Sequence, residues 1–129
     1  MIGGVDHISI QTSDFEKALK FYNGLLRLPI CVIPFYYKTR RLCYLDAGNI
    51  RIELYSTKTD GHPVVEYTAN RGGLDHISFR TADLTALVDR LRVSGVRILK
   101  PPFSITTDAG NSTLAFVEGP DGQEIELRQ

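Results

Sequence analysis

The chain has 129 residues, of which 43% are hydrophobic and 23% charged, the composition of an ordinary globular protein. Its 15 basic and 15 acidic residues balance to a net charge of zero, so no nucleic acid and no membrane is predicted as a partner, because both attract a concentrated basic surface. Apolar runs are too short to span a membrane, no signal segment is found at the start, and the two cysteines form no disulfide-type framework, so we predict a cytoplasmic protein.

The sequence contains an internal repeat. Residues 3–14 and 72–83 are identical at eight of twelve positions, and both copies contain the run Asp-His-Ile-Ser. A repeat of this kind predicts two structural units built on one plan.

The first copy predicts a strand, a helix and three more strands. The first strand covers residues 5–11, and the capping-box pattern Ser13-Asp14-Phe15-Glu16 predicts the start of a helix with apolar residues at helical spacing through Leu26. Strand-like segments follow at residues 30–37, 41–47 and 50–55. A turn at residues 46–49 joins the last two.

The second copy predicts the same order after a polar, turn-rich linker at residues 56–71. Its first strand covers residues 74–80, and Asp83 begins a helix that Gly95 ends. Strand-like segments follow at residues 96–99, around 103–106, 113–117 and 124–128. We therefore predict an α+β fold in which residues 1–129 form a single domain of two tandem βαβββ modules, one at about 1–55 and one at about 72–129.

Strand alternation brings four ionisable side chains to the face opposite the aliphatic one. His7 and His76 lie on the first strand of each module, and Glu53 and Glu126 lie on the last. Two imidazoles and two carboxylates can occupy four positions around a divalent metal, leaving two for water or a bidentate substrate. A single His or Glu on a half-polar strand is more often a solvated side chain. The two copies could also have kept only the packing pattern of a duplicated ancestor. Packing, however, explains poorly why both His and both Glu positions are kept on the face opposite the core.

Several motifs carry a family resemblance that covers essentially the whole chain. They are Asp6-His7-Ile8-Ser9, Phe15-Glu16-Lys17-Ala18, Ile52-Glu53-Leu54, Gly73-Leu74-Asp75-His76-Ile77 and Gly119-Pro120-Asp121-Gly122 with Ile125-Glu126-Leu127. On these motifs the chain resembles the vicinal oxygen chelate superfamily, which includes glyoxalase I, methylmalonyl-CoA epimerase, extradiol dioxygenases and bleomycin-binding proteins. The resemblance implies a cupped mixed β-sheet with helices on its outer face.

The resemblance also implies the metal ligands and the reaction. The ligands are His7, Glu53, His76 and Glu126, a set associated with bacterial glyoxalase I (lactoylglutathione lyase), and they imply one divalent ion per site: Ni, Co or Zn, with Mn and Fe also compatible. Epimerases of the family commonly carry Gln at the position of Glu53. The implied function is a lyase or isomerase in which the metal chelates adjacent substrate oxygens and a carboxylate moves a proton next to a carbonyl. Glu126 is implied as the base, with Glu53 returning the proton.

Three other activities stay open within the family. They are a methylmalonyl-CoA-epimerase-like isomerase, an antibiotic-binding protein of the bleomycin-resistance type without catalysis, and an Fe(II) dioxygenase. The absence of tryptophan and the presence of all four ligands rank the binding protein below the enzymes.

Candidate substrate-binding residues share the face that carries the ligands. They are Arg80, Gln11, Ser9, Ser78 and Tyr55. Gln11 stands where glyoxalase I has an Arg that helps to hold glutathione, so the sequence leaves glutathione dependence open. Arg80, at the mirrored position of the second module, offers a guanidinium for an anionic substrate.

Small members of the family often complete the site by dimerising. His7 and Glu53 of one chain then join His76 and Glu126 of the other. We predict a homodimer with two equivalent sites at its interface, acting on a small-molecule substrate.

Overall fold

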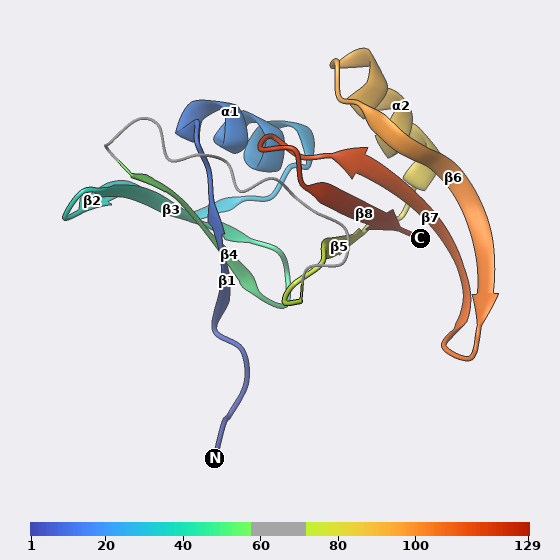
Figure 1. Ribbon diagram of the computed structural model, residues 1–129, viewed down its shortest axis with the longest axis horizontal. Helices are drawn as coiled ribbons and strands as arrows, with labels where there is room; N and C mark the ends of the chain where they lie inside the picture. Colours follow the sequence, from blue (N-terminus) through green and yellow to red (C-terminus); the bar gives the residue numbers. More distant parts are fainter. Residues whose placement is uncertain (58–71) are drawn as a thin grey trace. The chain divides into compact units, whose positions relative to one another are not determined.

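A computed structural model describes residues 1–57 and 72–129 of the chain. The chain divides into two compact units, Met1–Val65 and Glu66–Gln129. Each unit contains a strand, a helical segment and three further strands in that order, which confirms the predicted pair of βαβββ modules (Figure 1). The predicted linker lies outside the described residues except for Ser56 and Thr57, which continue the last strand of the first unit.

The first unit contains a four-stranded mixed sheet in the order β1-β4-β3-β2. Its elements are β1 (His7–Gln11), α1 (Phe15–Leu19), the π-helical segment η1 (Lys20–Leu25), β2 (Ile30–Tyr37), β3 (Arg40–Asp46) and β4 (Arg51–Thr57). Strands β1 and β4 run parallel, whereas the β2–β3 and β3–β4 pairs are antiparallel. The parallel pair therefore places the first and last strands of the unit side by side.

The second unit repeats this topology in the order β5-β8-β7-β6. Its elements are β5 (Ile77–Arg80), α2 (Leu84–Val93), β6 (Ile98–Thr107), β7 (Gly110–Glu118) and β8 (Glu124–Arg128). Strands β5 and β8 are the parallel pair. Among the described residues, no helix is long and apolar enough to cross a membrane.

One face of each sheet forms a core with the helical segment of the same unit. The most deeply buried residues of the first unit are Ala18, Tyr22, Cys43, Leu45, Ile52 and Leu54, and those of the second are Leu84, Val88, Leu91, Ala115, Val117, Ile125 and Leu127. Burying one large aliphatic side chain contributes about 1.5–3 kcal/mol, so each helix is held on its aliphatic face. The opposite face of each sheet is left for polar side chains.

Both helices begin at an aspartate. The side chain of Asp14 accepts a hydrogen bond from the backbone N–H of Lys17, and Asp83 does the same for Ala86. Asp83 was predicted as a cap, but in the first unit the cap lies one residue after the predicted Ser13. Such a side-chain cap contributes about 1 kcal/mol to helix stability.

The first helix is not the continuous α-helix predicted from its apolar spacing. It changes to a π-helix at Lys20, where Phe21 and Tyr22 are both buried with their rings 5.0 Å apart. A π-helical turn contains more residues than an α-helical one, so adjacent side chains diverge less. Two neighbouring aromatic rings can therefore both enter the core.

Strand β6 joins two segments that were predicted separately. It runs through Pro101 and Pro102, and its register with β7 shifts between Lys100 and Phe103. Proline lacks the N–H that a central strand requires, but β6 is at the edge of its sheet and tolerates it. The strand continues because the two prolines lie where its pairing with β7 is irregular.

Candidate metal centre

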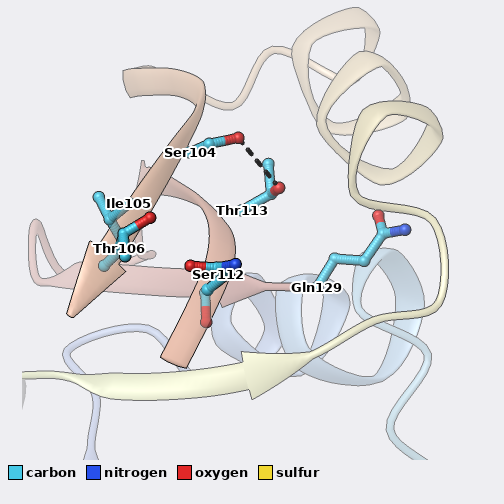
Figure 2. A pocket seen from close by; sticks show the side chains of 7 residues that line it. Ser104, Ile105, Thr106, Ser112, Thr113 and Gln129 are labelled. Atoms are coloured by element: carbon cyan, nitrogen blue, oxygen red, sulfur yellow. Dashed lines mark hydrogen bonds between the residues drawn. The ribbon is translucent and has the colours of Figure 1, made fainter. Parts of the chain in front are cut away.

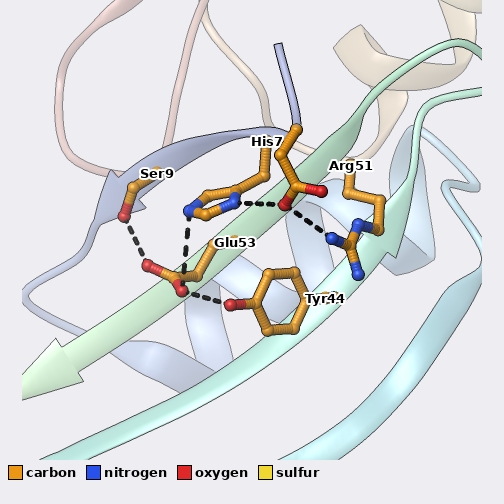
Figure 3. Close-up of polar contacts among 6 residues, drawn as sticks. His7, Ser9, Tyr44, Arg51 and Glu53 are labelled. Atoms are coloured by element: carbon orange, nitrogen blue, oxygen red, sulfur yellow. Dashed lines mark hydrogen bonds and ion pairs between the residues drawn. The ribbon is translucent and has the colours of Figure 1, made fainter. Parts of the chain in front are cut away.

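In the first unit, a histidine and a glutamate face each other across the parallel strand pair. His7 Nε2 lies 3.9 Å from Glu53 Oε2, and Ser9 Oγ donates a hydrogen bond to Glu53 Oε1 at 2.8 Å (Figure 3). The register pairs Ser9 with Glu53, so the three side chains share one face of the sheet. We call the face that carries the His and Glu side chains the ligand face.

The second unit contains the same arrangement. His76, immediately before β5, has its Nε2 3.4 Å from Glu126 Oε2, and Ser78 Oγ donates to Glu126 Oε1 at 2.6 Å. Glu126 is buried, with 7% of its surface exposed. The structure thus brings the four predicted ligands together as two pairs, one within each unit.

An aspartate holds the other nitrogen of each imidazole. His7 Nδ1 lies 2.8 Å from Asp6 Oδ2, and His76 Nδ1 lies 2.7 Å from Asp75 Oδ2. An ionised carboxylate only accepts hydrogen bonds, so Nδ1 is the donor in this contact and Nε2 is the nitrogen that faces the glutamate. Histidines that bind metals commonly have this carboxylate support.

Asp6 is itself held in its ionised form. The hydrogen bond from His7 lowers the pKa of Asp6, and Arg51, whose Nη2 donates to Asp6 Oδ2 at 2.6 Å, lowers it further. Arg51 also lies over the ring of Tyr44, 5.1 Å from its centroid. We call the His–Glu pair of each unit a half-site. In the first half-site, contacts therefore run from Arg51 through Asp6 to His7.

The two glutamates differ in the side chain that lies across from them on the third strand of each unit. Tyr44 pairs with Glu53 and donates its hydroxyl to Oε2 at 2.5 Å, whereas Phe116 pairs with Glu126 and has no hydroxyl to donate (Figure 3). Both rings meet the histidine of their unit edge-on, at 5.7 Å and 5.9 Å. The two half-sites thus differ by a single hydroxyl in this position.

This hydroxyl changes the ionisation of the first half-site. Burial tends to raise the pKa of Glu53, but the hydrogen bonds from Tyr44 and Ser9 outweigh it and the pKa is lowered. The same bond to Glu53 raises the pKa of Tyr44. Glu53 is consequently a fixed, ionised carboxylate with both oxygens occupied by donors.

The spacing within each pair is compatible with two ligands of one metal ion. Donors bound at about 2.1 Å to the same ion lie about 3.0 to 3.4 Å apart for angles between about 90° and 109°. The 3.4 Å of the second pair is within this range, and the 3.9 Å of the first needs a closure of about 0.5 Å. Within residues 1–57 and 72–129 no group of three or more His, Cys, Asp or Glu side chains is close enough to hold an ion. Each unit by itself therefore brings together one His–Glu pair, two of the four predicted ligands.

The predicted substrate-binding residues occupy the ligand face next to these pairs. Ser9 and Ser78 contact the glutamates, as described above. Gln11 accepts a hydrogen bond from the hydroxyl of Tyr55 at 3.2 Å, and Arg40 lies over the Tyr55 ring. Arg80 is exposed and pairs in register with an arginine on β8.

A cavity of about 390 Å³ lies in the second unit (Figure 2). It is lined by Ser104, Ile105, Thr106, Asn111, Ser112, Thr113 and Gln129. The hydroxyls of Ser104 and Thr113 lie 3.4 Å apart in its wall. None of the predicted site residues lines this cavity.

Three residues that contact the predicted ligands were not predicted from the sequence. Asp6 and Asp75 could have been found because the repeat contains the dipeptide Asp-His twice. Tyr44 could have been found from the turn at residues 46–49, since that turn fixes the pairing of Tyr44 with Glu53. These residues orient the predicted ligands.

Comparisons with known proteins agree on the family. The family model described as the Glyoxalase/Bleomycin resistance protein/Dioxygenase superfamily matches residues 4–127. A probable lactoylglutathione lyase of Synechocystis sp. is 28% identical, covering 95% of this chain and 92% of its own. An ethylmalonyl-CoA/methylmalonyl-CoA epimerase of Cereibacter sphaeroides is 29% identical over 77% of this chain and 76% of its own.

A solved structure shares the fold. The glyoxylase/bleomycin resistance protein/dioxygenase domain from Frankia sp. EAN1pec superimposes with a TM-score of 0.81 at 21% identity, covering 99% of this chain and 92% of that chain. At this identity the similarity concerns the fold alone, and function has to be argued from the residues of the site.

Proposed function

The chain belongs to the glyoxalase/bleomycin resistance protein/dioxygenase superfamily, and we propose that within it the protein is a divalent-metal-dependent lyase or isomerase of glyoxalase I type. The observation that carries this proposal is the repeated pair in which a carboxylate-supported histidine faces a glutamate. Relatives named lactoylglutathione lyase support a lyase in particular.

His7, Glu53, His76 and Glu126 would hold the metal, two from each unit. Neutral imidazole and carboxylate suit Ni, Co and Zn, and they are also compatible with Mn and Fe. When bound, the ion acts as a Lewis acid that chelates two adjacent substrate oxygens and stabilises the negative charge formed when a neighbouring C–H loses its proton.

The two glutamates have different roles in moving that proton. Glu53 is held by Tyr44 and Ser9, whereas Glu126 accepts its one side-chain hydrogen bond in the described part of the chain from Ser78. We assign Glu126 as the base, acting as a metal ligand that can detach, with Oε2 then taking the proton from the carbon beside the carbonyl, because in the described part of the chain no hydroxyl holds this oxygen. We propose that Glu53 returns the proton to the substrate, and because its carboxylate is held ionised it has to take up that proton first. Since Glu126 is buried, water competes little for this oxygen.

Other residues of the ligand face hold the carboxylates and the substrate. Ser9 and Ser78 orient the two glutamates, and we propose that they also border the bound substrate. Gln11 and Tyr55 contact it from the first unit, and Arg80 contacts it from the second. The substrate is a small molecule with two adjacent oxygens.

We also propose that the protein is a homodimer and that it acts in the cytoplasm. Each unit supplies two of four ligands, so a complete site needs a second pair, and proteins of this family commonly act as small-molecule-binding dimers. A two-fold dimer would create two equivalent sites at its interface.

The experiment that tests this function is an assay with the hemithioacetal of methylglyoxal and glutathione. Chelator-treated protein would be reconstituted in turn with Ni, Co, Zn and Mn, with Glu126→Gln as the matched inactive control. We expect metal-dependent formation of the thioester, reduced at least about 100-fold in the variant because general acid–base catalysis contributes about 10²–10⁴-fold. No turnover with any of the four metals would refute the lyase assignment.

An epimerase is the second candidate, favoured by the 29% identity to the Cereibacter relative. It requires the same proton transfer next to a thioester carbonyl. Exchange of the methine proton of methylmalonyl-CoA for deuterium in D₂O, followed by NMR, distinguishes it from the lyase. Exchange without hemithioacetal turnover would replace the first candidate with the second.

A further inference from the structure

Two arginines lie side by side on the ligand face of the second unit. Arg80 on β5 pairs with Arg128 on β8, two residues beyond the pair of Ser78 and Glu126. Residues two apart along a strand point to the same face, and the hydrogen bond from Ser78 to Glu126 identifies that face. The two side chains therefore start from the same face as the predicted base, and Arg128 reaches along this face to Ser112 on β7.

Such a pair is unfavourable unless an anion lies between the two charges. Like charges directly opposite each other on neighbouring strands destabilise a sheet. Arg128 Nη2 donates to Ser112 Oγ at 2.6 Å, and Arg80 is exposed. None of the ion pairs within residues 1–57 and 72–129 includes either arginine. In that part of the chain their charge is not balanced by an acidic side chain.

The first unit has no such pair at the equivalent positions. Gln11 and Tyr55 occupy them and hydrogen-bond to each other at 3.2 Å. The repeat thus retains the His, Glu, Ser and Asp residues in both copies but places two arginines in the second copy alone. Packing of the duplicated sheet does not require this difference, because the neutral pair satisfies the same register.

From this juxtaposition we infer that Arg80 and Arg128 bind a carboxylate group of the substrate. Two guanidinium groups can each offer a fork of donors to the two oxygens of a carboxylate. The inference rests on the proposed function and names its substrate class, an acid that carries a carboxylate in addition to the chelated oxygens. With a rise of about 3.3 Å per residue, Arg128 lies about 7 Å along the strand from Glu126. A small acid can therefore contact both the base and the arginines.

The test compares three 2-hydroxy acids as binding probes. 2-Hydroxyglutarate has the distal carboxylate, 2-hydroxypentanoate has the same chain length without it, and 3-phosphoglycerate carries a phosphate instead. Affinities would be measured by calorimetry on nickel-loaded protein and on chelator-treated protein. We expect wild type to bind 2-hydroxyglutarate at least about 10-fold more tightly than 2-hydroxypentanoate, a factor typical of charge-assisted contacts.

Substitutions of the two arginines test whether they cause the preference for 2-hydroxyglutarate. The double substitution of Arg80→Gln and Arg128→Gln is expected to reduce the ratio to about 2-fold or less, with each single substitution intermediate. Arg92→Gln is the matched control, because Arg92 lies on α2 and pairs with Asp89, and it should leave the ratio unchanged. An unchanged ratio in the double variant, similar affinities for both acids in wild type, or no binding of either would overturn the inference. Tighter binding of 3-phosphoglycerate than of 2-hydroxyglutarate would overturn the carboxylate assignment.

The outcome is separable from that of the proposed function. An arginine-dependent preference in chelator-treated protein, combined with no turnover in the hemithioacetal assay, would retain the carboxylate site and refute the lyase. Turnover without the preference would retain the lyase and refute the carboxylate site.

Discussion

Replacing Tyr44 by phenylalanine removes the hydroxyl that distinguishes the two half-sites and little else. The phenylalanine ring can retain the edge-on contact with His7, so packing is preserved. The lost interaction is the 2.5 Å hydrogen bond to Glu53 Oε2, whose side chain is 15% exposed. The reciprocal variant Phe116→Tyr adds a hydroxyl opposite Glu126 and serves as the matched control.

The loss of stability expected for Tyr44→Phe follows from the type of hydrogen bond that is removed. Hydrogen bonds to charged groups contribute about 1.5–3 kcal/mol, and we expect a value near the lower end because Tyr44 is only half-buried. Tyr44→Phe should therefore lower the free energy of unfolding by about 1.5 kcal/mol at pH 7. For a protein of this size the melting temperature should fall by roughly 3–6 °C.

The pH dependence of this stability difference distinguishes the hydrogen bond to ionised Glu53 from a change in packing. The pKa of Glu53 is lowered from its ordinary value of 4.5, so its contribution to stability is fully present above pH 4.5 and is lost as the pH falls through the lowered value. Urea denaturation of chelator-treated wild type and Tyr44→Phe from pH 7 to pH 3 should show a difference that shrinks below pH 4.5. An equal difference at both ends of this range would refute the reasoning, because it would point to packing rather than charge.

Three further predictions concern other features of the two units. Asp75→Asn should weaken metal affinity about 10–100-fold while retaining His76 as a ligand, and competition with a chromophoric chelator measures this; unchanged affinity would contradict the supporting role of the aspartate. Asp83→Ala should lower stability by about 1 kcal/mol because α2 loses its cap, and a thermal melt with no change would show that the cap contributes nothing. Burial raises the pKa of the Cys43 thiol to about 11 whereas Cys31 is exposed, so a thiol reagent at pH 8 should modify Cys31 quickly and Cys43 only after denaturation; rapid reaction of both would contradict the burial.

The repeat and the strand period were enough to predict the order of elements and the ligand face. His7, His76, Glu53 and Glu126 alternate with aliphatic neighbours, and the structure brings each His to the Glu of its own unit. This worked because the side-chain period of a strand is fixed by its backbone.

Asp6 and Asp75 were missed because the strand period does not apply to residues that precede a strand. Alternation places Asp6 on the opposite face from His7, but β1 begins at His7 and the preceding residue is not bound by the strand period. Asp75 likewise lies before β5, which begins at Ile77. Residues outside the strand can fold back onto their neighbour, which no periodicity reveals. The π-helical segment escaped prediction because tertiary packing of adjacent aromatic rings overrides local apolar spacing.

We propose above that His7, Glu53, His76 and Glu126 are ligands of one metal ion. The most direct test is the metal content per chain, measured by mass spectrometry after chelator treatment and dialysis against nickel. Wild type, His7→Ala and His76→Ala would be compared, with Arg92→Gln as a control outside the site. We predict close to one ion per chain in wild type and in the control, and loss of the ion in both histidine variants. No retained metal in wild type would contradict the account and favour an antibiotic-binding protein without catalysis, whereas metal lost in only one histidine variant would show that a single unit suffices.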